Sequence, residues 1–101
     1  MKVFDLNRMK AFPYEQRDQN VFYRANEFKA RIVDLPPGGE MPSCEMASYV
    51  ISYVLSGQAR VTVDSETVEL KENQCLITEP ATLSMRTEKG ATLMGVQIVK
   101  T

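Results

Sequence analysis

The stretch GGEMPSCEMASYVISYVLSG, residues 38–57, decides the fold of this chain. Its second half, residues 49–55, is rich in β-branched and aromatic residues, which favour a β-strand. The pair Ser56-Gly57 that follows is a turn signal, and the stretch also begins with two glycines, Gly38 and Gly39. The pattern predicts extended chain held between two turns.

Period-2 alternation dominates the rest of the chain, and helical periodicity is nearly absent. Residues 60–64 and 67–70 alternate polar and apolar side chains on either side of the polar turn 64–66, which predicts a hairpin. Asn73, a residue type that tolerates a left-handed backbone, marks the next turn. Further strands are expected at residues 21–24, 26–35, 74–78, 83–87 and 92–99.

So many short strands in 101 residues predict one all-β domain, a sandwich or a barrel, because a lone open sheet would leave its edges exposed. No helix longer than about three turns is expected. The packed sheet surfaces are expected to include Val61, Val63, Val68, Leu70, Leu76, Leu93, Val96 and Ile98.

The first 25 residues follow this pattern least. Residues 2–6 fit an edge strand, and residues 7–20, with Pro13 among them, fit an ordered arm that contains one short helical turn at most. We therefore divide the chain into an N-terminal strand or arm at residues 1–25 and a β-barrel at residues 26–101.

Composition excludes several classes of function. The chain has 44% hydrophobic and 25% charged residues, and no apolar run approaches the ~20 residues of a membrane span. The N-terminus lacks a signal-peptide core, so a cytoplasmic protein is expected. The formal charge of −1, with scattered basic residues, argues against nucleic-acid binding. Cys44 and Cys75 are too few for a zinc module and are expected to be reduced thiols.

The spacing within residues 38–57 resembles the first motif of the cupins: glycine, five residues, His-x-His, three or four residues, glutamate, six residues, glycine. Gly38 and Gly57 occupy the glycine positions, and Cys44, Met46 and Val50 stand at the two histidines and the glutamate. The runs Leu-Pro-Pro-Gly-Gly at 35–39 and Tyr-Val-Leu-Ser-Gly at 53–57 are also similar. The resemblance covers residues 26–99 and implies a single-domain cupin-type double-stranded β-helix, the RmlC-like jelly-roll barrel.

The second cupin motif runs glycine, five residues, Pro-x-Gly, two residues, histidine, three residues, asparagine. Aligned from Asn73, it places Ser84 at the histidine, and none of its signature residues is present. The whole chain contains no histidine. Valine at position 50 has no donor atom, and serine offers only a neutral hydroxyl. Neither the metal typical of the family nor any other cofactor is therefore expected.

Cys44 and Met46 nevertheless leave one metal alternative open. Residues two apart point to the same face of a strand, and a thiol with a thioether suits Cu(I) better than harder metals. No third soft ligand is evident nearby in the sequence. The preferred interpretation is that both side chains fill apolar space in the barrel.

In the cupin register, one face of the strand through residues 44–54 looks into the barrel. The same alternation places Ser84 and Arg86 together across the pocket mouth. Arg86 suits a carboxylate or a phosphate, although a rim position facing solvent or paired with Glu88 is the preferred interpretation, because surface arginines are common. The ligand-binding candidates are Cys44, Met46, Ser48, Val50, Ser52, Ser84 and Arg86.

Tyr49 and Tyr53 have the opposite parity, which predicts an apolar outer face on this sheet. Such a face on a small domain suggests a partner. In cupin-like proteins the partner is usually a second copy, so the resemblance implies a homodimer, with the N-terminal arm a candidate for exchange across the interface.

The leading interpretation is a metal-free cupin-fold protein that binds a small, partly apolar or anionic molecule in its barrel without catalysis. The alternatives are a metal-independent isomerase- or lyase-like enzyme and the Cu(I) binder. The enzyme would need a histidine or a perturbed carboxylate in the barrel, and a Cys44 nucleophile would need a base. No catalytic residue is assigned.

Overall fold

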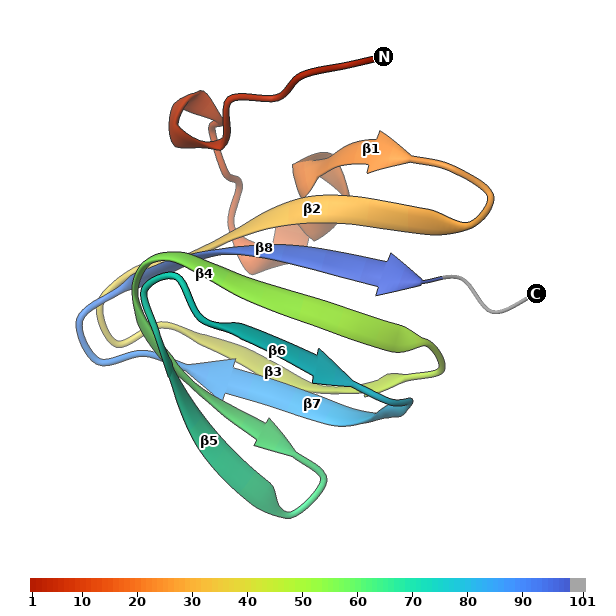
Figure 1. Cartoon of the computed structure of the whole chain (residues 1–101). Helices are drawn as coiled ribbons and strands as arrows, with labels where there is room; N and C mark the ends of the chain where they lie inside the picture. The colour runs from red at the N-terminus through yellow and green to blue at the C-terminus, as the bar shows by residue number, and fades with distance from the viewer. Residues whose placement is uncertain (99–101) are drawn as a thin grey trace.

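The computed structural model describes residues 1–98 and is built almost entirely of strands, which confirms the all-β prediction (Figure 1). Its helical elements are two short 3-10 helices, η1 and η2. In chain order the elements are η1 (Leu6–Arg8), η2 (Tyr14–Asn20), β1 (Val21–Arg24), β2 (Phe28–Leu35), β3 (Glu40–Met46), β4 (Tyr49–Val63), β5 (Glu66–Lys71), β6 (Cys75–Thr78), β7 (Ala81–Arg86) and β8 (Ala91–Ile98).

The strands form two antiparallel sheets that share β4. The first sheet has the order β1-β2-β8-β4-β6, and the second has the order β3-β7-β4-β5. Residues 49–57 of β4 pair with β8, whereas residues 58–63 pair with β5. Figure 1 shows β4 bending from one sheet into the other, so that the two sheets curl toward each other as a half-barrel. The cupin-type jelly-roll prediction is therefore confirmed.

A bulge in the middle of β4 lets one strand serve both sheets. The register of its pairing with β8 shifts between Val54 and Ser56. Before the shift the even-numbered Val50 and Val54 are buried, and after it the odd-numbered Ala59 and Val61 are buried. The extra residue bends the strand and keeps its apolar side chains on the inner side of both sheets.

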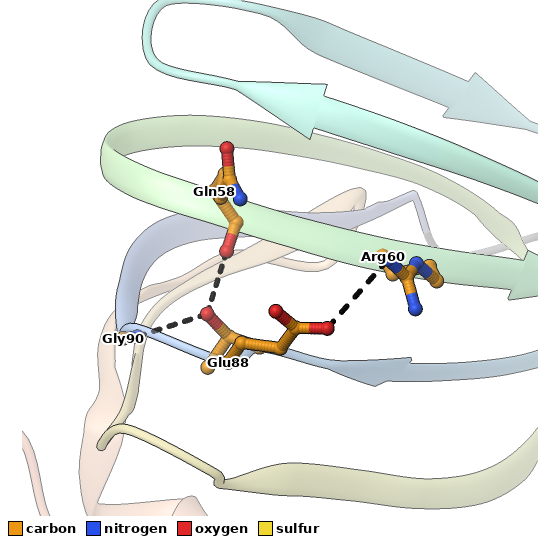
Figure 2. Close-up of polar contacts among 5 residues, drawn as sticks. Gln58, Arg60, Glu88 and Gly90 are labelled. Carbon is orange, nitrogen blue, oxygen red and sulfur yellow. Dashed lines mark hydrogen bonds and ion pairs between the residues drawn. The ribbon is translucent and has the colours of Figure 1, made fainter.

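Contacts around Gly57 fasten this bend. Gly57 has a φ of +79°, and a Cβ atom there would overlap with the carbonyl oxygen of Gly90, so the position requires glycine. The hydroxyl of buried Thr87 donates to the carbonyl oxygen of Gln58 (2.7 Å) and accepts from the N–H of Gly90 (3.0 Å). Figure 2 shows Gln58 and Gly90 on either side of this contact. The first motif's final glycine is thus the hinge between the sheets.

The hydrophobic core lies between the sheets and draws on the inner faces of both. Five of the predicted packing residues belong to it or pack against it: Val61, Val63, Leu70, Leu76 and Leu93. Val96 is half-buried, and Val68 and Ile98 are exposed to 42% and 38%. The alternation located most of the strands but did not distinguish the inner apolar face from the outer one. Two local predictions were wrong: the expected turn at Ser56-Gly57 is absent, because β4 continues through it, and the expected strand through residues 44–54 is divided by a turn at residues 47–48 into the end of β3 and the start of β4.

The N-terminal arm departs from the prediction in one respect. Residues 2–5 form no strand, so the predicted edge strand is wrong, and Asp5 instead caps η1 by accepting a hydrogen bond from the N–H of Asn7 (3.1 Å). Two short helical elements replace the single expected turn. Residues 21–24 do form the expected short strand, paired with β2. The last strand ends at Ile98, and Val99, placed in it by the prediction, lies outside the described residues.

Candidate functional site

A cavity of about 260 Å³ lies between the two sheets, with η2 at its mouth. Strands β2, β8 and β4 of the first sheet form one wall, and β3 and β7 of the second sheet form the other. This position corresponds to the barrel interior that the sequence predicted as the ligand pocket.

Sulfur-containing and aliphatic side chains line the wall formed by the second sheet. Met41 and Met85 are direct cross-strand partners in the β3–β7 pair, and both face the cavity. A shift of register after Met41 then turns Cys44 and Met46 to the same face. Four sulfur atoms therefore lie along one wall, although only two were evident from the spacing of residues 44–46.

Basic residues dominate the opposite wall and the mouth. Lys29 and Arg31 come from β2, and Arg17 and Asp18 come from η2. Three cations against one carboxylate give this side of the cavity a formal charge of +2. Gln97 of β8 adds a polar amide next to Arg31.

Arg31 is the most constrained of these charges. Its Nη2 donates to the side-chain oxygen of Gln97 (3.3 Å), while its Nε is buried and has no hydrogen-bond partner among the described residues. Burial lowers the pKa of Arg31 most, the carboxylate of Asp18 raises it, and Arg17 lowers it again. A guanidinium N–H that is removed from water and left unpaired has a strong preference for an acceptor.

Four of the seven predicted site residues line this cavity: Cys44, Met46, Val50 and Ser52. Ser48 lies in the turn between β3 and β4 and is not part of the wall. The expected side-chain positions are thus found for the candidates in β3 and β4.

Ser84 and Arg86 do not face this cavity, so their predicted placement at its mouth is wrong. In β7 the buried residues are Leu83 and Met85, which point inward, and the residues between them point outward. The motif spacing is therefore one residue out of phase with the strand. Ser84 and Arg86 instead line a shallow hollow on the outer side of the second sheet.

Charged residues cross this outer side in a row. Arg86 pairs in register with Glu40 and with Arg60, and Arg60 pairs in register with Glu69. Oε1 of Glu88 lies 3.9 Å from Nη2 of Arg60. Figure 2 marks this contact, so the ion pair that the sequence offered as an alternative for Arg86 is made by Arg60. Both side chains of that pair are well exposed, and such a pair contributes little to stability.

The metal of typical cupins does not fit the residues present. Val50 occupies a ligand position without a donor atom, and Ser84, at another, faces away from the cavity. Within residues 1–98, no three His, Cys, Asp or Glu side chains come together in a way that could hold a metal ion. The residues at these positions therefore do not fit a metal that needs nitrogen or oxygen ligands.

Sequence reasoning missed the basic wall. In β2 the apolar Ala30 and Ile32 alternate with Lys29 and Arg31, and alternation alone assigns the apolar pair to the core. Both faces are in fact covered, because the N-terminal arm packs Leu6 over the side that carries Ile32. The available signal was that Lys29 and Arg31 lie on one face of β2 while the other face is apolar, so a covered strand would turn both basic side chains toward the interior.

The fold and the interior cavity together define a cupin-type domain. Solved structures agree: TT1209 from Thermus thermophilus is 22% identical, with a TM-score of 0.84 over 97% of each chain. SPY1581, a conserved protein of unknown function from Streptococcus pyogenes, is 18% identical, with a TM-score of 0.79 over 99% of this chain and 89% of its own. A cupin superfamily protein from Desulfitobacterium hafniense is 11% identical, with a TM-score of 0.75 over 79% of this chain and 74% of its own. Identities this low show the fold alone.

The family is given by the sequence itself. Residues 10–94 match the HutD family model, so the chain belongs to the HutD family. No curated protein matches the sequence significantly. None of the helical segments within residues 1–98 has the length and hydrophobicity needed to span a bilayer.

Proposed function

We propose that this protein binds a small carboxylate in the barrel cavity, without a metal and without transforming it. The observation that carries the proposal is the Nε of Arg31 on a wall of the cavity, which is buried and has no hydrogen-bond partner within residues 1–98. The planar guanidinium fork matches the two oxygens of a carboxylate. Lys29 and Arg17 at the mouth add attraction for an anion.

The remaining wall suits an apolar body attached to that carboxylate. Met41, Met46, Val50, Leu83 and Met85 offer methyl and thioether surface, and methionine adapts to the shape of its neighbour. The cavity of about 260 Å³ is at or below the size of typical small-molecule sites, so the ligand is expected to be small.

Binding of simple carboxylates tests this proposal. Isothermal titration with acetate, butyrate and benzoate, each beside its uncharged amide, should show affinity for the acids and little for the amides. Arg31→Gln should lower the benzoate affinity at least about tenfold, as expected for loss of a charge-assisted hydrogen bond. Arg86→Gln is the matched control, since Arg86 lies outside the cavity and should leave the affinity unchanged.

Equal effects of the two arginine variants would contradict the proposal, as would tight binding of the amides. If proton NMR showed that the bound acid is converted to a product, the protein would be an enzyme and the binding-only proposal would be wrong.

A second candidate function is binding of Cu(I), and the four sulfur atoms on one wall favour it. One thiolate with thioethers is the ligand type that selects Cu(I) over harder divalent metals. Met41 and Met85, as cross-strand partners, have Cβ atoms about 4.5–5.5 Å apart and three rotatable bonds each with which to converge. They supply the further soft ligands that Cys44 and Met46 lacked.

The chain offers matched controls for this candidate. Cys44→Ser and Met85→Leu should each weaken Cu(I) binding, measured by competition with bicinchoninate under reducing conditions. Cys75→Ser and Met94→Leu remove the same groups outside the cavity and should have no effect. If all four variants bind alike, the sulfur atoms serve only to pack the barrel.

We also propose a homodimer formed through the outer face of the first sheet. Tyr49 pairs in register with Ile98, and Ile51 with Ile77, so these apolar side chains share one face. Tyr49, Ile77 and Ile98 are 49%, 64% and 38% exposed. None of these residues is charged, so a second copy related by a two-fold axis can pack the same face against this one without charge repulsion.

Light scattering tests the dimer. The wild type should have twice the chain mass of 11.4 kDa at micromolar concentration, and Ile77→Lys should reduce it to the chain mass. Val68→Lys is the control, because Val68 is exposed on the second sheet instead. A monomeric wild type would overturn this proposal.

A further inference from the structure

The segment that closes the mouth of the cavity is held by a buried side chain, that of Asn20. Only 6% of Asn20 is exposed, and it lies at the end of η2. Its side-chain oxygen accepts from the N–H of Phe12 (2.7 Å), and its side-chain nitrogen donates to the carbonyl of Phe12 (2.9 Å). The amide thus satisfies both backbone groups of one residue and closes residues 12–20 into a loop.

The loop has little internal structure of its own. η2 is a 3-10 helix, a poorer hydrogen-bonded form that is normally short, and Gln16 inside it has non-helical φ and ψ of −113° and 28°. Arg17 stacks on the Tyr14 ring at 4.4 Å and donates to the Tyr14 carbonyl at 3.2 Å. These contacts shape the tip of the loop, whereas the clamp at Asn20 fixes its two ends.

The tip of this loop is part of the cavity. Tyr14, Arg17 and Asp18 line the same hollow as Arg31, and η2 packs against β2, the strand that carries Arg31. The hydrophobic core contains no residue of the loop among those the structure describes. Removing the clamp should therefore open the mouth and leave the barrel folded.

We infer that Asn20 is a positioning residue: by clamping Phe12 it holds Tyr14, Arg17 and Asp18 over the mouth of the cavity, where they shield Arg31 and retain a bound carboxylate. This inference rests on the proposed function for its ligand, but the shielding of Arg31 is measurable without one. Asn20 itself does not line the cavity and acts through the loop.

The experiment compares Asn20→Ala with Asn7→Ala, which removes the same side chain from an exposed position in the arm. Phenylglyoxal modification of Arg31 is followed by peptide mass spectrometry, with the exposed Arg86 as internal reference. Benzoate affinity is titrated in parallel. Asn20→Asp retains the acceptor for the Phe12 N–H but cannot donate to the Phe12 carbonyl, so its Arg31 modification rate and benzoate affinity are expected to lie between those of wild type and Asn20→Ala. It replaces Asn20→Ala in the comparison if that variant does not fold.

Loss of two buried hydrogen bonds should raise the Arg31 modification rate about tenfold and lower benzoate affinity by a similar factor, with Asn7→Ala unchanged. An unchanged Arg31 rate in Asn20→Ala overturns the inference, and so does a raised rate with undiminished affinity. If the wild type binds no carboxylate while Asn20→Ala still exposes Arg31, the proposed function is wrong and the positioning of the mouth by Asn20 stands.

Discussion

Arg31 lies directly opposite Gly95 across the β2–β8 pair, and a Cβ atom at position 95 would sit 3.7 Å from the Cγ of Arg31. The missing side chain of Gly95 leaves room for the stem of Arg31 to lie over the backbone of β8. The guanidinium can therefore remain inside the cavity instead of turning out to solvent.

Filling this space should impair binding more than stability. Gly95→Ala places its methyl group at ordinary contact distance and should leave both the denaturation midpoint and the carboxylate affinity close to wild type. Gly95→Val adds branches against Arg31 and should lower benzoate affinity at least about tenfold, because the guanidinium loses its position. Equal affinities of the alanine and valine variants would show that the space is not used.

Replacing Arg31 should stabilise the empty protein. Burial lowers the pKa of Arg31, which means that the folded state disfavours its charged form. Because arginine is charged at neutral pH in the folded and unfolded states alike, the cost is present throughout that range and would be relieved only in strong alkali. Arg31→Met should therefore raise the free energy of unfolding by up to about 1 kcal/mol, a small value because the side chain is half-buried and screened by water.

Urea unfolding at pH 7 measures this difference, and the same variant should have lost carboxylate binding. A destabilised Arg31→Met would mean that the hydrogen bond to Gln97 outweighs the cost of burial.

Gly57 and Gly38 provide a matched pair for the bend in β4. Both have positive φ, +79° and +77°, but only Gly57 lies against another backbone segment. Gly38→Ala should cost about 1–2 kcal/mol of stability, as is usual for a left-handed residue that carries a side chain. Gly57→Ala should cost clearly more, because its methyl group would overlap with the Gly90 carbonyl. Equal urea midpoints for the two variants would contradict this assignment.

A designed metal site can test the register of β7. Cys44→His, Met46→His and Val50→Glu restore three ligand positions that line the cavity. Adding Met85→His should complete a site for Ni(II), whereas adding Ser84→His should not, because Ser84 faces outward. Calorimetric titration of the two quadruple variants distinguishes them. Stronger binding with the histidine at position 84 would mean that β7 faces the other way.

The strands could be predicted from the sequence because alternation is a local property. The turns at Asp64 and Asn73 were equally local, and both residues do adopt positive φ, of 54° and 67°. The inward phase of β7 was also readable, since its apolar residues Ala81, Leu83 and Met85 alternate with polar ones. Aligning Ser84 with a motif histidine overrode this signal.

The charged half of the site could not be predicted in the same way. Arg31 enters the cavity because its strand is covered on the other face by the N-terminal arm, a contact between segments distant in sequence. Arg17 and Asp18 arrive on a loop whose position depends on Asn20 and Phe12. Alternation describes one strand at a time, so it carries no information about which segment covers a face.

The passage of β4 through both sheets has a consequence for the way this protein comes apart. β4 is an internal strand of both sheets, and neither sheet can lose it without the other losing it too, because residues 49–57 and 58–63 are one continuous element. The domain should therefore melt as a single cooperative unit. Amide exchange at Val54 in the first sheet and at Val61 in the second should report the same opening free energy, equal to that of global unfolding.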